Sequence, residues 1–419
     1  MIKTISNALE THRNEINELV SKYLEDSEVP IYSSFDLRNS GFKIAAVDPN
    51  VFPAGFNNVC QQDLRAAATP LEQIIRKRFG NNIQTIGIYT EDHTKNTYYF
   101  QNLFSLLKLF EDTGFETVLV STNDRLKDDP AELETAERDT IEIHQLHQNG
   151  KQLTADDQQL DLIISNNDFS TGVVDILSNT SVPVTPPPSM GWWRRKKSDH
   201  FRHSQEILEE LCDIIGLDPW RIIPYTIAID DVDFAEQEGF EQISRAIDRI
   251  IAQTQEQYEQ YGIDQKPYAF VKSNQGTYGM GVYSFESGEE FLGINRDQRD
   301  SMARRKGGAE NTSVIVQEGI PTVDRVAGLV AEPVIYCLEH RPIGGFLRTN
   351  EEQSERENLN NRGMDFTSED LCTLFVDDAD KNQGSNITQD KVEVYKLLAT
   401  VGALACGKEI AQQASPHPA

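Results

Sequence analysis

Hydrophobic positions along the chain fall into blocks that predict helices alternating with short strands. Residues 1–27 place apolar side chains near a 3.6-residue period and predict one amphipathic helix. Further on, apolar runs at 85–89, 116–120 and 160–165 predict buried strands, with a helical pattern between the first two. Short strands separated by helices are typical of a doubly wound α/β layer, which we expect within residues 61–190.

Polar residues follow two of these strands directly. Glu91-Asp92-His93 comes after the first strand, and Asn166, Asn167 and Asp168 come after the third. Ligands bind at the carboxyl ends of strands in sheets of this kind, so both groups are candidate site residues. Capping and turn formation are the alternative roles for each asparagine or aspartate.

The second half of the chain starts after a proline-rich connector, residues 182–188, which cannot be helical. Beyond it the apolar patterns predict helices at 200–215, 236–261 and 391–410, and strands at 313–318 and within 331–348. Two polar stretches, 349–365 and 380–385, predict loops. We therefore divide the chain into an N-terminal segment 1–60, an α/β domain 61–190, a pair of α+β lobes 191–411 and a disordered tail 412–419.

Composition narrows the classes of function. A chain of 419 residues has room for two to three domains. Its net charge of -28 argues against nucleic acid and anionic membranes as partners. No stretch of eighteen apolar residues and no apolar N-terminal leader occur, so we expect a cytoplasmic protein. The five cysteines are scattered without a C-x-x-C pair, which predicts reduced thiols and neither a disulfide framework nor a zinc site.

The segment with the most specific chemistry is the glycine-rich hairpin 269–285. An apolar strand delivers Lys272, three glycines follow, and a second apolar strand begins; the glycines are Gly276, Gly279 and Gly281. Backbone N–H groups approach a phosphate closely where no Cβ intervenes, and the lysine supplies a point charge. No helix pattern follows the glycines, so this is neither a Walker A loop nor a dinucleotide fingerprint. A flexible hairpin without a ligand is the alternative.

Other elements supply what ATP needs around this hairpin. Lys196 or Lys197 ends a basic cluster and offers a second cation. The strand 314–318 has the form of a hinge for adenine, with Gln317 or Glu318 reaching an amino or ribose hydroxyl group. ATP requires its base held, its phosphates neutralised and its magnesium bound by oxygen ligands.

In this order the elements resemble the ATP-grasp superfamily. The resemblance implies that Lys272 is the central strand lysine, that 276–281 covers the phosphates and that 317–318 forms the adenine hinge. The segment 332–348 is similar to bacterial glutathione synthetases and implies that Arg348 stabilises a transferring phosphoryl group. The implied ATP-binding residues are Lys197, Lys272, Asn274, Gly276, Gly279, Gly281, Gln317, Glu318, Asn358 and Asn360.

The ATP-grasp resemblance implies a strand with magnesium-binding residues after the last helix, and no such pattern occurs there. Instead, residues 42–58 deliver Asp48 and Asn50 on one strand face, where hard oxygen ligands suit Mg²⁺. This stretch resembles the metal strand of eukaryotic glutathione synthetases, which implies a circularly permuted ATP-grasp fold. A plain turn is the alternative reading of Asp48-Pro49-Asn50. Gln275, Glu318 and Glu332 are all candidates for a third ligand.

The whole pattern resembles bacterial ATP-grasp glutamate–cysteine ligases. The resemblance implies ATP-dependent formation of γ-glutamylcysteine through an acyl phosphate, with ATP and Mg²⁺ required and L-glutamate and L-cysteine as small-molecule partners. Lys272 and Arg348 are the implied catalytic residues. Candidates for binding the zwitterionic substrates are Ser34, Arg38, Asn57, Asn58, Asn166, Asn167, Asp168 and Arg194.

Three other functions share this nucleotide site. Glutathione synthetase would use γ-glutamylcysteine and glycine, a peptide ligase would join two unmodified amino acids, and a regulatory protein would bind ATP without turnover. Retention of Asp48, Asn50, Lys272 and Arg348 weighs against the last. A homodimer is common among ATP-grasp proteins, but no segment of this chain predicts one.

Overall fold

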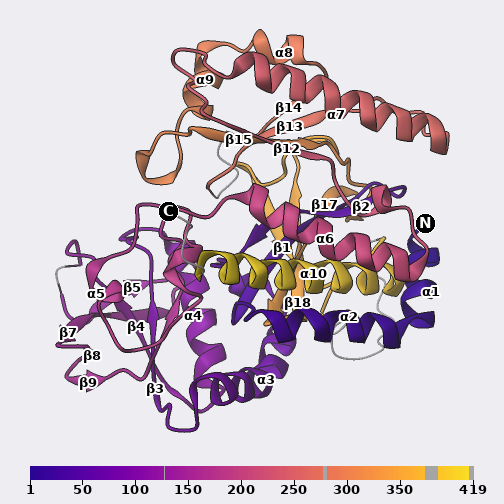
Figure 1. The fold of residues 1–419 in the computed structure, drawn as a ribbon. Coiled ribbons are helices and arrows are strands. Elements are labelled where there is room, and N and C mark those ends of the chain that lie inside the picture. Colours follow the sequence, from indigo (N-terminus) through magenta and orange to yellow (C-terminus); the bar gives the residue numbers. More distant parts are fainter. Residues whose placement is uncertain (127, 277–280, 373–385, 415–419) are drawn as a thin grey trace.

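The computed structural model describes residues 1–414 except for residue 127 and the segments 277–280 and 373–385. It has a mixed α/β architecture in three parts, which confirms the predicted class (Figure 1). Gly279, the predicted loop 380–385 and the last residues of the predicted tail, 415–419, lie outside the described residues. The remainder of that tail, 412–414, is helical.

The central sheet joins both ends of the chain. Its strands follow the antiparallel order β19-β18-β17-β1-β2, with β16 paired to β17. The strands are β1 (Tyr32–Asn39), β2 (Ile44–Asn50), β16 (Arg325–Val326), β17 (Leu329–Leu338), β18 (Arg341–Asn350) and β19 (Met364–Thr367). Strands from the first fifty residues therefore pair directly with strands from the last hundred.

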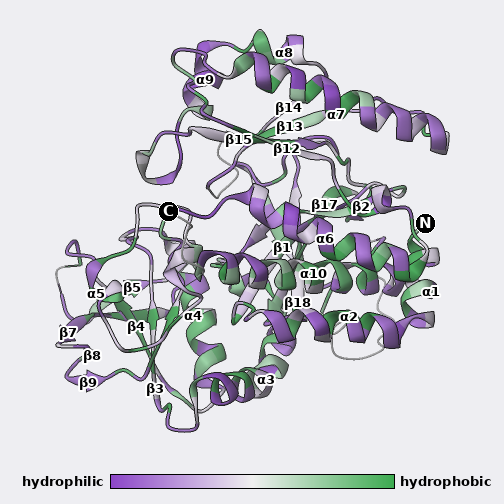
Figure 2. Cartoon of the chain, viewed as in Figure 1, coloured by the Kyte–Doolittle hydropathy of each residue, from purple (hydrophilic) through white to green (hydrophobic). Residues whose placement is uncertain are grey.

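A group of helices covers this sheet. Figure 1 shows α10 (Gln389–Ala414) and α6 (Lys197–Ile215) side by side, with α1 (Ile2–Thr11) and α2 (Arg13–Asp26) against them. Figure 2 shows α10 as largely hydrophobic, because it packs on the sheet and on the other helices at once. The prediction of a single helix over 1–27 is wrong, because the helix is interrupted at His12, which separates α1 from α2.

The α/β domain has a mainly parallel sheet in the order β11-β10-β3-β4-β6, with β5 antiparallel at the edge. A hairpin group, β7-β8-β9, lies beside it. Its elements are β3 (Thr85–Tyr89), β4 (Glu116–Ser121), β5 (Ala131–Glu134), β6 (Thr140–Gln145), β7 (His147–Asn149), β8 (Gln152–Ala155), β9 (Gln158–Gln159), β10 (Leu162–Ser165), β11 (Val184–Thr185), α3 (Gln61–Phe79), α4 (Thr97–Glu111) and α5 (Asp175–Ser178).

A smaller lobe stands above the central sheet in Figure 1. Its antiparallel sheet, β12-β15-β13-β14, is covered by α7 and α8 around a core of its own. Its elements are β12 (Thr226–Asp230), α7 (Phe240–Tyr261), β13 (Ala269–Ser273), β14 (Tyr283–Phe285), α8 (Gly288–Leu292), α9 (Arg296–Met302) and β15 (Ser313–Glu318). The described part of the chain also has four short 3-10 turns: η1 (Phe56–Asn58), η2 (Pro188–Met190), η3 (Pro219–Arg221) and η4 (Lys306–Gly308).

Two strands that bear on the site differ in how far the sequence predicted them. β2 runs on through Asp48-Pro49-Asn50, which confirms the predicted strand and rules out the turn alternative; proline is tolerated there because β2 is an edge strand. β1 was not predicted, since its sequence, Y-S-S-F-D-L-R-N, has polar residues where alternation would require apolar ones. None of the described helices has the length and apolar character needed to cross a bilayer.

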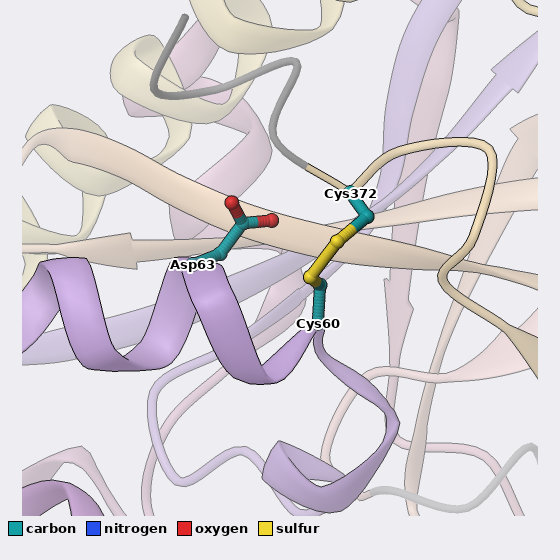
Figure 3. A group of neighbouring side chains, drawn as sticks. All are labelled: Cys60, Asp63 and Cys372. Atoms are coloured by element: carbon teal, nitrogen blue, oxygen red, sulfur yellow. A yellow bond between two sulfur atoms is a disulfide. The ribbon is translucent and has the colours of Figure 1, made fainter. Parts of the chain in front are cut away.

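The expectation of five reduced cysteines is wrong for one pair. Cys60 and Cys372 form a disulfide whose Cα atoms are 5.3 Å apart, although 312 residues separate them in sequence (Figure 3). Cys60 is the N-cap residue of α3, and Asp63 lies in the first turn of this helix. Sequence spacing could not reveal the pair because only the fold brings the two segments together. Cys212, Cys337 and Cys406 are buried free thiols.

Candidate active site

A cleft lies between the central sheet and the small lobe. Its empty space is about 780 Å³, open to solvent, and its walls come from β1, β2 and β17 on one side and β13 and β15 on the other. Among the described residues, its charged lining comprises six cations, Arg38, Lys197, Lys272, Arg304, Arg305 and Lys306, and three carboxylates, Asp36, Asp48 and Glu332; Glu318 also borders it, but its carboxylate is paired in the core. A cationic excess in a chain of net charge -28 marks a site for a polyanion.

Carboxylates and arginines interlock on the floor of the cleft. Asp36 and Asp48 are direct neighbours across β1 and β2. Arg348 Nη1 lies 2.6 Å from Asp36 Oδ2 and 3.4 Å from Glu332 Oε2. Burial raises the pKa of Asp36; Arg348 opposes this shift, and the charges of Asp48 and Glu332 add to it. The carboxylates of Asp36, Asp48 and Glu332 therefore lie on neighbouring strands, close to the guanidinium group of Arg348.

The predicted metal strand reaches this cluster in part. Asp48 lines the cleft, and its Oδ1 is 2.5 Å from Lys197 Nζ. Asn50 is absent from the described lining, and its side-chain oxygen accepts a hydrogen bond from the Phe52 N–H at 3.0 Å. Of the three candidates for a further ligand, Glu332 is the one beside the Asp36–Arg348 pair.

Lys272 is buried at the centre of the cleft. Its Nζ donates to Gln317 Oε1 at 2.8 Å and to the Val47 carbonyl at 3.2 Å. Burial lowers its pKa to about 8, and the nearby Asp48 carboxylate resists that shift. Gln317 also donates to Thr226 Oγ1 at 3.1 Å, so in this structure its amide holds the lysine in place.

The glycine hairpin has the backbone that its sequence predicts. Gly276 and Gly281 have φ values of 142° and 64°, which residues with a side chain rarely adopt. A Cβ at Gly281 would lie 3.2 Å from both Met302 Cα and the Ser301 carbonyl oxygen. Gly276 and Ser273 line the cleft at the end of β13. The described part of the loop thus brings backbone close to the cations.

Two residues predicted to contact the nucleotide have side chains that bind other parts of the protein. The Glu318 carboxylate is paired with Lys43 at 2.7 Å in the core and also accepts from Trp220 Nε1 at 3.0 Å. Asn274 is fully buried and joins β13 to α6: its side-chain oxygen accepts from the Ser198 N–H at 2.9 Å. Sequence could not show that both polar side chains face the protein interior.

Arg38 binds the loop that lies over the cleft. Its guanidinium binds the Glu332 carboxylate and donates to backbone carbonyls of Ile320 and Glu355 at 3.1 and 3.2 Å, and to that of Glu357. Asn358 and Asn360, from the same loop, line the cleft as predicted for nucleotide contacts. Arg38 lines the cleft, and its substrate contact stays a prediction; in this structure its donors bind protein groups.

The other predicted substrate residues are not among the described residues that line this cleft. Asn57 Nδ2 donates to Asn58 Oδ1 at 2.9 Å within η1. Asn166 and Asn167 donate to the Pro53 and Thr90 carbonyls, both at 2.9 Å, and join loops. Ser34 is buried on β1, Arg194 is half-buried beside Trp193, and Asp168 is paired with Lys306 at 2.8 Å.

Sequence reasoning missed Asp36 and the basic triplet Arg304-Arg305-Lys306. Asp36 sits on the strand that was not predicted, and its signal is the polar alternation D-L-R in a segment flanked by apolar residues. The triplet is a second basic cluster in an acidic chain, which is the same signal that identified Lys196 and Lys197.

Comparisons with known proteins agree with this geometry. The family model GshA, glutamate-cysteine ligase, matches residues 6–410. The crystal structure of a protein named as a putative gamma-glutamylcysteine synthetase from Methylobacillus flagellatus KT is 30% identical, covers 98% of this chain and 96% of its own, and has a TM-score of 0.87.

Two remoter structures share little with the chain. D-alanyl-alanine synthetase A from Vibrio cholerae O1 biovar eltor is 12% identical over 78% of this chain and 81% of its own, with a TM-score of 0.35. A glutathione synthetase-like effector from Globodera pallida is 12% identical over 83% and 74%, with a TM-score of 0.33. Neither structure bears on the function of this chain. No curated protein sequence matches it. The family model and the Methylobacillus structure, which both span nearly all of the chain, show that this protein belongs to the glutamate–cysteine ligase family.

Proposed function

We propose that the cleft between the central sheet and the small lobe is where this protein joins L-glutamate to L-cysteine at the expense of ATP. Family membership makes the protein a ligase of glutathione biosynthesis. The observation that carries the location is the convergence of Lys197 and Lys272 with three carboxylates in one cleft, two of which are also paired with Arg348. We expect the apolar lining, Val47, Phe270, Val282 and Ile320, to receive the adenine.

The topology supports a circularly permuted ATP-grasp fold. The two lobes that enclose the cleft are the central sheet and the β12–β15 sheet, and β1 and β2 from the N-terminal segment complete the first. In this arrangement β1 lies between the Asp48 strand, β2, and the Glu332 strand, β17, and all three strands contribute residues to one wall of the cleft. Deleting residues 1–60 is expected to abolish folding of the sheet; a truncated protein that still binds ATP would contradict the permutation.

The chemistry follows from charge. The γ-carboxylate of glutamate attacks the γ-phosphorus of ATP, and the bond to ADP breaks to give γ-glutamyl phosphate. The amine of cysteine then attacks the acyl carbon, and inorganic phosphate leaves. Lys197, Lys272 and Arg348 offset the negative charge that gathers on the phosphates. Arg38 holds the loop carrying Asn358 over the cleft, where it limits access of water to the acyl phosphate.

The acidic residues of the cleft fit a magnesium ion. Asp36, Asp48 and Glu332 are hard oxygen donors from adjacent strands, the ligand type that Mg²⁺ prefers. Bound Mg²⁺ would neutralise phosphate oxygens of ATP. Without the ion, the same carboxylates are neutralised by Lys197, Arg38 and Arg348.

The test is ADP release with Mg²⁺-ATP and defined amino acids, with product masses read in parallel. Glutamate plus cysteine should give ADP and γ-glutamylcysteine in equal amounts, and Lys272→Met should reduce kcat without unfolding the protein. Ser287→Ala, a helix cap on the far side of the small lobe, is the matched control. Release only with γ-glutamylcysteine and glycine would contradict the proposal and assign glutathione synthetase activity.

A further inference from the structure

A second cluster of charged residues lies next to the cleft, at the carboxyl edge of the α/β sheet. Glu91 comes two residues after β3, and Asp168 comes three residues after β10. The two strands are parallel neighbours, with Tyr89 opposite Ser165, so their following loops meet at one edge. The carboxyl side chains of Glu91 and Asp168 are only 10% and 6% exposed.

The cation between these carboxylates comes from the small lobe. Lys306, on η4, contacts Glu91 Oε2, and its Nζ is 2.8 Å from Asp168 Oδ2. His93 Nε2 is 3.4 Å from the same Glu91 oxygen. Burial raises the pKa of Asp168, and the neighbouring Glu91 charge raises it further. Two nearly buried carboxylates this close require a cation between them, and an ammonium group fills that position here.

Lys306 also lines the nucleotide cleft, beside Arg304 and Arg305. Its ammonium group can therefore bind two anionic partners: the carboxylate pair, and the phosphates of bound ATP. A polyphosphate carries more negative charge than the pair, so ATP is expected to draw the lysine toward the cleft. The carboxylate pair would then be left without its cation.

We propose that Glu91 and Asp168 form the binding site for the α-ammonium group of the glutamate substrate, and that Lys306 occupies this site until ATP draws it away. The inference rests on the proposed function. It couples the two substrates, because bound ATP releases the site that glutamate needs.

Chemistry assigns the site to glutamate rather than to cysteine. Cysteine attacks through its amine, which must be unprotonated, and two carboxylates would hold it as an unreactive ammonium ion. Glutamate has the opposite requirement. In γ-glutamyl phosphate an unprotonated α-nitrogen would attack the γ-acyl carbon, expel phosphate and, after losing a proton, leave the five-membered lactam 5-oxoproline. A carboxylate pair that keeps this nitrogen protonated prevents the side reaction.

The first experiment removes one charge at a time with Glu91→Gln and Asp168→Asn. Each should raise KM for glutamate about tenfold or more, the effect of losing one charge-assisted hydrogen bond, with little change in KM for ATP. Each should also increase the 5-oxoproline formed per ADP. Asp124→Asn, the same charge loss at an exposed residue in the turn after β4, is the matched control and should change neither value. Unchanged glutamate KM and lactam yield in both site variants would overturn the proposal.

A second variant should change the affinity for glutamate in the opposite direction. Lys306→Met removes the resident ammonium, so calorimetry without nucleotide should show tighter glutamate binding than in the wild type, while ATP binds more weakly. Equal or weaker glutamate binding by Lys306→Met would overturn the proposal even if the acidic variants fail to fold. If wild-type protein releases no ADP with glutamate and cysteine, the proposed function itself fails, which is a different outcome from an active enzyme with unchanged variants.

Discussion

Lys272 makes ATP binding sensitive to pH above neutrality. Burial lowers its pKa to about 8, from 10.5 in an unstructured chain. Phosphate oxygens of ATP stabilise the charged form, so binding should return the pKa toward or above its ordinary value. Below pH 8 the free enzyme already carries the proton, whereas between pH 8 and 10.5 ATP binding must be accompanied by proton uptake.

The size of the effect follows from the protonated fraction. For a pKa of about 8, this fraction falls from about 0.9 at pH 7 to about 0.1 at pH 9. The apparent ATP affinity should therefore weaken about tenfold over this interval, or about 1.4 kcal/mol. Lys43 also has a pKa lowered to about 8 by burial, but it pairs with Glu318 in the core and does not line the cleft.

Titration calorimetry in two buffers of different ionisation enthalpy measures both quantities. We expect uptake of about 0.9 proton per ATP at pH 9 and about 0.1 at pH 7, with Mg²⁺ held constant. Lys272→Arg, which stays charged, should abolish the pH dependence, and Lys43→Met is the control that should retain it. A wild-type affinity that is flat from pH 7 to 9, or proton uptake that survives in Lys272→Arg, would refute the reasoning.

The remaining predictions concern the metal cluster, the disulfide and the core. Glu332→Gln should raise the Mg²⁺ concentration needed for half-maximal activity about tenfold or more, with the melting temperature as control; an unchanged requirement would remove Glu332 from the metal site. Iodoacetamide should label Cys60 and Cys372 in unfolded protein only after reduction, and labelling without reductant would show that both are thiols. Glu409→Gln leaves the buried Arg195 unpaired and should cost about 3–5 kcal/mol in urea unfolding; a loss below about 1 kcal/mol would contradict this.

The site was predictable where its residues lie on apolar strands with a local signature. Lys272 ends the buried strand β13 and is followed by glycines that adopt positive φ, so both features are visible in consecutive residues. Asp36 was harder to predict, because the alternation F-D-L-R in β1 is short and two serines interrupt it on the N-terminal side. The positions of the Glu318 and Asn274 side chains were not predictable for another reason: both bind buried partners that lie far away in sequence.

The sequence by itself determined the mixed α/β class, the helices α4, α6, α7 and α10, the glycine hairpin and the family resemblance that the comparisons confirm. These properties depend on apolar periodicity and on short motifs, which are local in the chain. Only the tertiary structure decided which strands share the central sheet, that Arg348 joins Asp36 to Glu332, and that Cys60 meets Cys372. It also decided that Lys306 reaches Glu91 and Asp168, 215 and 138 residues away. Such contacts arise when whole elements pack, and no local pattern of residues encodes them.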